Sequence, residues 1–425
     1  MGCWWYNVAA FYGGDFMLSV QEARTRILSN FYPVDTLVLP LEHAAGRVLA
    51  QDITAAIDLP PFDNSSVDGF ALKATDVEGA EPASPRTLEV VADIPAGSSP
   101  EIILQAGQAA RIMTGAPLPL GADAVVMVED TDFKTRDAGS PTPSRVAIYR
   151  TVRRNNSIRR RGDDLHAGEI VLRAGQQVRA QEIGLLAMLG VDQMTVYRRP
   201  RLALLSSGDE LVEVNTPLMP GKVRDANSYT LATLAEGSGA EIIRLGVAAD
   251  RPEDIRERID RAVASQADVI VSSAGVSVGA FDYVKMVVEE QGELDFWQVN
   301  MRPGKPLAFG RYRGIPFFGL PGNPVSAFIG YLVYVRPALD RLSGKTEPLS
   351  FRLTARLVEP LESDGRESYL RAVVFQENGK LMARLTGHQG SGNIFSLVQA
   401  NALLIVPSGV KSLPARSEVQ IWRIE

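Results

Sequence analysis

Four short loops rich in glycine, serine and proline carry the first groups in this sequence that could do chemistry. They span 206–210, 273–279, 302–306 and 319–324, and each follows an apolar run as long as a strand. The backbone N–H groups and hydroxyls of such loops can bind a phosphate or another anion, especially where a helix begins. One such loop would be an ordinary turn, but four in succession predict a ligand site. Its expected contacts are Ser206, Gly208, Gly275, Ser277, Gly279, Pro303, Gly304, Lys305, Pro321, Gly322 and Asn323.

Acidic residues stand in the same loops or just after a predicted strand: Asp209, Glu210, Asp250 and Asp282. Mg²⁺ takes oxygen ligands and often binds through one or two carboxylates together with substrate phosphates. Helix capping explains Asp250 and Asp282 one at a time. It does not explain why all four acids fall beside the predicted anion site. We therefore expect a Mg²⁺ site made from Asp209, Glu210 and Asp282.

An earlier stretch of the chain holds two more dense groups of polar residues. Residues 60–71 read PPFDNSSVDGFA, residues 159–164 read RRRGDD, and the segment RIMTGAP lies between them. An arginine cluster beside two aspartates could hold an oxyanion and a cation together. A solvated charged surface explains the same run equally well. The candidate groups in this stretch are the carboxylates, amide and hydroxyls of 63–68, the hydroxyl of Thr114, and the arginines and aspartates of 159–164.

Composition limits the chemistry further. The 425 residues include one Cys and three His, set against 50 Asp plus Glu. A single cysteine excludes a disulfide within the chain, and four Cys or His ligands for structural zinc cannot plausibly be gathered. Any metal must therefore be held through oxygen. The net charge of −6 argues against broad nucleic-acid binding, which requires a basic surface.

Several other classes of protein lack their sequence signals here. No G-x-G-x-x-G opens a helix and no G-x-x-x-x-G-K-[ST] occurs, which argues against NAD-dependent enzymes and P-loop NTPases. No apolar run reaches the roughly 18 residues of a membrane helix. The N-terminus lacks the basic start and the cleavage site of a signal peptide. We expect a cytoplasmic protein, and we expect residues 1–16 to be an extension ahead of the first helix.

The order of apolar and breaker residues divides the rest of the chain into several parts. Ser19 and Glu22 form a capping box for a helix at 19–31, and 41–50 has the pattern of a second short helix. The expected parts are a linking region (17–54 and 165–197), a β-rich domain (55–164), an α/β domain (198–346) and a C-terminal β domain (347–425).

The α/β part has the most regular pattern. Apolar strands alternate with helices, which indicates a parallel sheet covered on both faces. The last of its expected helices is long and spans 324–341. In the C-terminal part, the residues ENGK at 377–380 carry the signal of a β-hairpin turn.

With these motifs assembled, the chain resembles the molybdopterin molybdenumtransferase family, which includes the MoeA-like proteins and the E domains of gephyrin and its plant counterpart. The resemblance covers about residues 18–425 and follows the order of the family's motifs. The matching stretches are PPFDNSSVDGFA, RIMTGAPLPLGADAVV, IRRRGDDL, LLSSGDEL, VSSAGVSVGAFDY, RPGKPLAFG, FFGLPGNPVSAF and TGHQGSGNIFSL.

The resemblance implies a fold, a reaction and partners. The fold is α/β plus β and multidomain, with a parallel α/β pterin-binding domain, a β-rich insert, a small linking α+β region and a C-terminal β-barrel-like domain. The reaction inserts molybdate into adenylylated molybdopterin, with Mg²⁺-dependent release of AMP. The protein would be a homodimer with its active site at the subunit interface. An upstream adenylyltransferase and molybdoenzymes are possible partners, whereas nucleic acid and membrane are not.

The resemblance also implies roles for individual residues. The catalytic positions it indicates are Asp68, Asp164, Glu210, Asp250 and Asp282. Thr114 and Arg159 would contact substrate, and the residues that would approach the molybdate are Arg302, Arg371 and Ser391.

Two alternatives remain open at this point. An adenylyltransferase of the same superfamily would need the α/β domain alone, and a non-catalytic pterin-binding scaffold would need no reactive groups. Tungstate, which is nearly isosteric with molybdate, could also be the preferred oxyanion.

Overall fold

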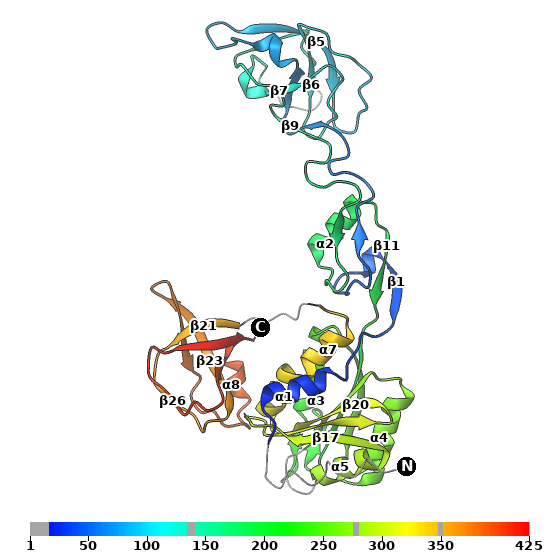
Figure 1. The fold of residues 1–425 in the computed structure, drawn as a ribbon, viewed down its shortest axis with the longest axis vertical. Helices are drawn as coiled ribbons and strands as arrows, with labels where there is room; N and C mark the ends of the chain where they lie inside the picture. The colour runs from blue at the N-terminus through cyan, green and yellow to red at the C-terminus, as the bar shows by residue number, and fades with distance from the viewer. Residues whose placement is uncertain (1–16, 134–140, 275–279, 347–351, 425) are drawn as a thin grey trace, which may run out of the picture. The chain divides into compact units, whose positions relative to one another are not determined.

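The computed structural model describes residues 17–133, 141–274, 280–346 and 352–424 (Figure 1). The extension expected at 1–16 therefore lies outside the described residues. The contacts divide the chain into two units. The first comprises Met1–Gln51, Ala174–Ala187 and Val191–Glu425, and the second comprises Asp52–Arg173 with Met188–Gly190. Within the described ranges, no helix has both the length and the apolar composition that crossing a bilayer demands.

The second unit is built on a five-stranded sheet. In sheet order its strands are β7 (Ala124–Met127), β4 (Gly69–Leu72), β6 (Gln108–Ile112), β5 (Arg86–Ile94) and β8 (Arg145–Ile148). Alternate residues of β4 enter two different apolar clusters, Phe70 and Leu72 in one and Ala71 in the other. At Gly69 a Cβ would lie 1.9 Å from the Val126 carbonyl oxygen, so only glycine permits this close pairing. The strand β4 is therefore central and buried on both faces.

The linking region of the first unit contains α1 (Val20–Leu28), α2 (Ala180–Met188) and the antiparallel pair β1 (Thr36–Pro40) and β11 (Gln193–Tyr197). The capping box at the start of α1 is confirmed. The Glu22 N–H donates to Ser19 Oγ at 3.2 Å, and the Ser19 N–H donates to the Glu22 carboxylate at 2.9 Å.

The short helix expected at 41–50 is wrong. Only Leu41–His43 form a turn of 3₁₀-helix, and Gly46 then adopts φ +78°, which ends any helix. The next residues, Val48 and Leu49, instead make bridges to Gln177 and Val196. Pairing with distant segments has overridden the local helical pattern.

The α/β domain contains a six-stranded sheet (Figure 1). In sheet order its strands are β15 (Glu241–Ala248), β12 (Arg201–Ser207), β16 (Val269–Ala274), β20 (Ile315–Pro321), β19 (Pro306–Tyr312) and β17 (Gly292–Gln298). The first four strands are parallel. One face is covered by α3 (Asn227–Gly237) and α6 (Pro324–Gly330), and the other by α4 (Pro252–Ala264) and α5 (Ala280–Gln291).

One strand of this sheet was not expected. β19 is antiparallel to both β17 and β20, so the sheet is mixed at that end rather than wholly parallel. Pro306 is its first residue, a position where a strand tolerates proline. Because Pro306 also ends the RPGKP loop, the sequence pattern there indicated only a loop.

The long helix expected at 324–341 is present but interrupted. Between α6 and α7 (Arg336–Leu342), residues Tyr331–Val335 form a π-helical turn, and the Arg336 N–H donates to the Tyr331 carbonyl five residues earlier. Pro337 has no N–H, and its ring would clash with the preceding turn of a regular helix. The wider turn accommodates it.

The C-terminal part is a closed five-stranded β-barrel. Around the ring its strands are β23 (Glu367–Glu377), β24 (Lys380–Leu385), β21 (Arg352–Leu357), β27 (Glu418–Arg423) and β25 (Ala402–Val406), which pairs with β23 again. Asn378 and Gly379 have φ +48° and +73° between the paired residues Glu377 and Lys380, which confirms the predicted hairpin turn. A short strand of the α/β domain, β18 (Met301–Arg302), pairs with β23 and so attaches the loop at 302–306 to the barrel.

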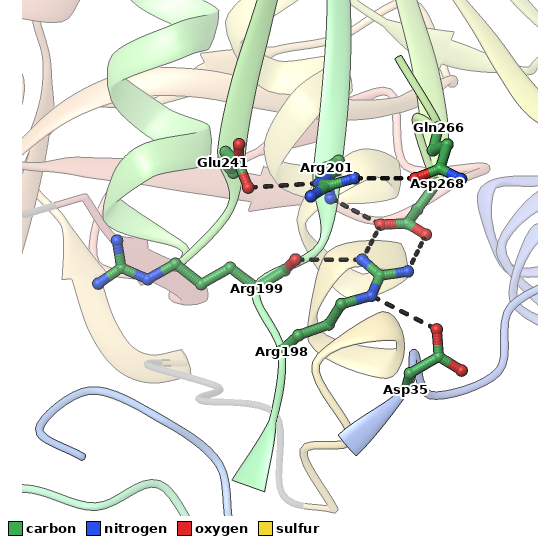
Figure 2. Close-up of polar contacts among 7 residues, drawn as sticks. All are labelled: Asp35, Arg198, Arg199, Arg201, Glu241, Gln266 and Asp268. Carbon is green, nitrogen blue, oxygen red and sulfur yellow. Dashed lines mark hydrogen bonds and ion pairs between the residues drawn. The ribbon is translucent and has the colours of Figure 1, made fainter. Parts of the chain in front are cut away.

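Charged side chains join the linking region to the amino-terminal edge of the α/β sheet (Figure 2). The Arg198 guanidinium donates two hydrogen bonds of 2.7 Å to the Asp268 carboxylate, which also accepts from the Arg201 N–H at 2.7 Å. The Asp268 side chain is only 14% exposed, whereas Asp35, 3.6 Å from Arg198, is 91% exposed. Asp268 therefore provides the main polar contact at this junction.

Substitution of Asp268 should destabilise the protein more than substitution of Asp35. Asp268→Ala leaves a partly buried guanidinium and a backbone N–H without their acceptor, so we expect the free energy of unfolding to fall by about 2–3 kcal/mol. Asp35→Ala should cost less than about 0.5 kcal/mol, since exposed ion pairs contribute little. Urea denaturation of both variants measures the difference, and equal losses would contradict this account.

Candidate active site

The connections between strands create a crevice at the carboxyl ends of β12 and β16. From β12 the chain passes through α3 on one face to β15, and from β16 it passes through α5 on the other face toward β17. Such a topological switch point is where open α/β sheets bind their ligands. A cavity of about 480 Å³ lies beside these strand ends, lined by Glu210, Leu211, Val223, Arg224, Asp225, Ala226, Asn227, Ser273, Gly322, Asn323 and Pro324.

One side chain ties three parts of this cavity together. Asn227, the first residue of α3, is 9% exposed, and its amide nitrogen lies 2.7 Å from both Ser273 Oγ and the Gly322 carbonyl oxygen. Neither Asn227 nor Ser273 was among the predicted contacts. An asparagine at the start of a helix has the pattern of an N-cap, and nothing local indicates a partner 46 residues away.

The predicted contact Ser206 lies beside Ser273 in the sheet. The two residues are paired in register on β12 and β16, and Ser206 is 1% exposed. Its hydroxyl makes no hydrogen bond in the described structure. Gly208 follows with φ +148°, where a Cβ would lie 2.7 Å from Glu210 Oε2. The glycine therefore lets the Glu210 carboxylate fold back over the loop.

Three acids meet at this edge. The Asp209 N–H donates to Asp250 Oδ2 at 3.3 Å, and the Asp250 N–H donates to Asp209 Oδ1 at 3.1 Å. Burial, together with the negative charges of Asp209 and Glu210, raises the pKa of Asp250, although the Asp209 N–H opposes the shift. The other oxygen of Asp250, Oδ1, is buried without a hydrogen-bond partner in the described structure.

This acidic group suits a divalent cation that is also held by a substrate. The described residues gather no set of three or more acids, histidines or cysteines that could hold a metal alone. Asp250 and Glu210 can still supply the one or two carboxylates that Mg²⁺ needs when phosphate oxygens complete its shell. Asp209 faces the Asp250 backbone, and the side chain of Asp282, in α5, lies outside the described part. Their assignment as Mg²⁺ ligands stays a prediction.

A second cavity, of about 430 Å³, lies between the loop at 302–306 and the barrel. Asn323 lines both cavities, so they adjoin at this residue. Four cationic side chains line the second cavity, and no acidic side chain of the described residues does. Its lining is Arg302, Pro303, Gly304, Lys305, Pro306, Pro321, Asn323, Ser326, Arg366, Leu370, Arg371, Gln389, Gly390 and Ser391.

The most unusual group in this lining is the Arg371 guanidinium. Arg371 is 0% exposed, and it donates to Ser396 Oγ at 2.9 Å and to the Gly390 carbonyl at 3.0 Å. Among the described residues, its buried Nη1 has no hydrogen-bond partner, and no carboxylate accepts from the guanidinium. Burial and the charge of Arg302 lower the pKa of Arg371 to about 10, which leaves it cationic at neutral pH. A buried cation without a counter-charge favours entry of an anion.

Neighbouring groups hold the loop at 302–306 in place. Gly304 has φ +102°, which requires glycine. Asp364 accepts from Arg366 Nε at 3.0 Å and lies 3.7 Å from Arg302 Nη1, and these contacts lower the pKa of Asp364. The Ser391 carbonyl accepts from the Val325 N–H at 3.1 Å, which anchors the barrel loop to the start of α6.

In the second unit, two of the predicted motifs lie side by side. The short strands β3 (Asn64–Ser65) and β9 (Ile158–Arg159) pair with each other. Asp68 Oδ1 accepts from both the N–H and the hydroxyl of Thr114, each at 2.7 Å. The three arginines of the RRRGDD run each pair with an aspartate, Arg159 with Asp164, Arg160 with Asp63 and Arg161 with Asp58. Their charges are therefore largely balanced within the unit.

The structure leaves some predicted contacts untested. Gly275, Ser277 and Gly279 lie outside the described residues. We call the 480 Å³ cavity beside the ends of β12 and β16 the switch-point cavity, and the 430 Å³ cavity around Arg371 the cationic cavity. Of the remaining predicted contacts, Gly322 lines the switch-point cavity. The cationic cavity is instead lined by Pro303, Gly304, Lys305 and Pro321.

Three successive parts of the chain match known protein domains. Residues 203–341 match the probable molybdopterin-binding domain. Residues 18–190 match the MoeA N-terminal region, domains I and II, and residues 354–424 match the MoeA C-terminal region, domain IV. The three matches together cover nearly the whole described chain.

Similar sequences and structures agree with these domains. The chain is 39% identical to a molybdopterin molybdenumtransferase of Nostoc sp. over 96% of this chain and 94% of that protein. It is 37% identical to molybdopterin molybdenumtransferase 2 of Mycobacterium tuberculosis over 96% and 99% of the two chains. A crystal structure of a molybdopterin biosynthesis MoeA protein from Pyrococcus horikoshii is 32% identical, with a TM-score of 0.78 over 96% of this chain and all of that one. The chain therefore belongs to the molybdopterin molybdenumtransferase family, and the multidomain α/β plus β fold expected from its sequence is confirmed.

Because the buried negative charge of Asp250 destabilises the folded protein, we predict that its removal increases stability in a pH-dependent way. Folding raises the pKa of Asp250, so the penalty is absent below the ordinary value of 3.8, grows as the pH rises toward the folded value, and is complete above it. Without divalent cations, Asp250→Asn should therefore raise the urea midpoint at neutral pH and change it little at about pH 3.

Asp254→Asn provides the matched control. Burial alone would raise the pKa of Asp254, but hydrogen bonds from the Ala249 N–H and from Arg258 lower it overall. This substitution should destabilise the protein at neutral pH by about 1 kcal/mol. A loss of stability in both variants at neutral pH would contradict the interpretation of Asp250.

Proposed function

We propose that this enzyme inserts molybdate into adenylylated molybdopterin and releases AMP. The single observation that carries the proposal is the cationic cavity around Arg371, which adjoins the switch-point cavity at Asn323. Molybdate is a tetrahedral dianion and molybdopterin carries the dithiolene sulfurs that receive the metal. Two adjoining cavities of different charge suit two substrates that must react with each other.

The residues of the cationic cavity would bind and orient the oxyanion. Arg371 has a free Nη1 and no carboxylate partner among the described residues, so an oxyanion would satisfy both its hydrogen bond and its charge. Arg302 and Lys305 would add charge from the opposite wall. Because no sulfur-bearing side chain is among the described residues that line this cavity, the molybdenum would find its soft sulfur ligands on the pterin.

The acids at the switch point would serve the release of AMP. A divalent cation there supplies neutralisation of the charge that develops on the departing phosphate. Asp250 and Glu210 would hold it, and the buried unpartnered oxygen of Asp250 supports that assignment. Asp282 is proposed as a further ligand of this cation because of its position in the family's motif.

The second unit would act on the substrate of a second subunit. By resemblance, Asp68, Thr114 and Asp164 take the family's functional positions. Asp68 and Thr114 are joined in the second unit, whereas the residues that line both cavities belong to the first. We propose a homodimer in which this unit completes the partner's active site. A cytoplasmic location, an upstream adenylyltransferase and recipient molybdoenzymes belong to the same proposal.

Release of AMP tests the reaction. Wild-type protein with adenylylated molybdopterin, molybdate and Mg²⁺ should release AMP, and omission of molybdate should prevent it. The same protein with molybdopterin and Mg-ATP should form no pyrophosphate. Pyrophosphate formation without molybdate-dependent AMP release would instead identify an adenylyltransferase.

Mixed dimers test the shared site. Asp68→Ala and Asp250→Ala should each abolish AMP release in the homodimer, because each removes a group from every site. After subunit exchange of the two variants, half the dimers are mixed and each mixed dimer has one intact composite site, so roughly a quarter of wild-type activity should return. No recovery, with exchange verified by mass spectrometry of differently tagged subunits, would show that each subunit uses its own Asp68.

A further inference from the structure

We propose that the Ser273 hydroxyl donates a hydrogen bond to an acceptor atom of the pterin ring, and that Asn227 is the positioning residue that aims this hydroxyl. The inference rests on the proposed function, which puts molybdopterin in the 480 Å³ cavity. Neither residue was a predicted contact.

The direction of the hydrogen bonds is fixed by chemistry. The Gly322 carbonyl oxygen can only accept, so the Asn227 side-chain atom 2.7 Å from it is the amide nitrogen. The same nitrogen lies 2.7 Å from Ser273 Oγ and must donate to it as well. Ser273 Oγ is therefore an acceptor in this contact, and its own proton is left for another group.

That proton has no acceptor among the described residues. Ser273 is 2% exposed and lines the cavity, and the only hydrogen bond of its hydroxyl in the described structure is the one from Asn227. A buried hydroxyl proton without an acceptor costs free energy, and a ligand that supplies an acceptor recovers it. A site built in this way discriminates strongly against a ligand that lacks the matching atom.

The rest of the lining favours the pterin ring over the phosphate as the source of that acceptor. Glu210 and Asp225 both line the cavity, and Asp225 is 4% exposed. Glu210 is assigned above to the divalent cation, but the Asp225 carboxylate would repel a phosphate at this wall, although Arg224 also lines the cavity, with its Nε donating to the Val214 carbonyl. The pterin ring carries an amino group and a ring N–H that suit carboxylates, next to a carbonyl that suits a hydroxyl donor.

Two serines of one strand provide the test. Ser272 and Ser273 are adjacent in β16 and both buried, but Ser272 lies on the opposite face of the sheet from Asn227, and its hydroxyl has no partner in the described structure. Ser273→Ala should weaken binding of molybdopterin roughly tenfold, whereas Ser272→Ala should leave it within about twofold. Binding is followed anaerobically by pterin fluorescence, with the unfolding midpoint of each variant measured in parallel.

A second ligand shows whether the pterin ring or the phosphate supplies the acceptor atom. Ser273→Ala should weaken binding of 6-hydroxymethyl-dihydropterin, which has no phosphate, by the same factor. A loss with molybdopterin alone would assign the hydroxyl to the phosphate and overturn the pterin contact. Wild-type protein that does not bind molybdopterin would overturn the proposed function, whereas equal binding by wild type and Ser273→Ala would overturn this inference alone.

The positioning role of Asn227 has its own test. In Asn227→Asp the carboxylate can only accept, so it should draw the Ser273 proton away from the ligand. This variant should lose as much affinity as Ser273→Ala, and the double variant should lose no more than either. Additive losses would overturn the positioning role. Should Asn227→Asp fail to fold, the same comparison is made with Asn227→Ala, which frees the hydroxyl to rotate and should lose less affinity than Ser273→Ala.

Discussion

The constraint on which the account depends is a buried positive charge that no carboxylate of the described residues neutralises. Arg371 is fully enclosed where the barrel meets the α/β domain, and neutral oxygens are its only partners among the described residues. Burying a cation in this way is costly unless an anion completes the site. The surrounding structure maintains the arrangement, because β18 pairs with β23 and brings Arg302 close to Arg371. The barrel and the α/β domain must therefore stay docked for the oxyanion cavity to exist.

The two edges of the α/β sheet differ in whether their buried polar groups have hydrogen-bond partners among the described residues. At the amino-terminal edge, Arg198 and Asp268 satisfy each other, and the junction is a source of stability. At the carboxyl edge, Asp250 keeps an unpartnered oxygen, and Ser206 keeps an unpartnered hydroxyl in the described structure. A binding site on a stable scaffold requires this difference. Polar groups are satisfied where the scaffold is held together and left unsatisfied where a ligand binds, because activity is commonly maintained at some cost in stability.

Much of this fold could be predicted from the sequence, and the gaps have physical causes. The capping box at Ser19 and the hairpin turn at Asn378 are local, so their residues alone indicated them. The strand β19 was missed because Pro306 ends a loop and begins a strand at once. The pairing of Asn227 with Ser273 depends on how α3 crosses the sheet, which no local pattern records. The resemblance indicated a role for Arg371, but its burial became apparent only from the closed barrel.

The most direct test of the central claim is the position of molybdenum in crystals of the protein soaked with molybdate, located by anomalous scattering at the molybdenum edge. The account predicts a peak in the cationic cavity within hydrogen-bonding distance of the Arg371 guanidinium. The peak should be lost in Arg371→Gln and retained in Arg384→Gln, which removes an exposed arginine that stacks on Phe375 of the same barrel. Molybdate bound elsewhere, with the Arg371 cavity free of it, would contradict the account.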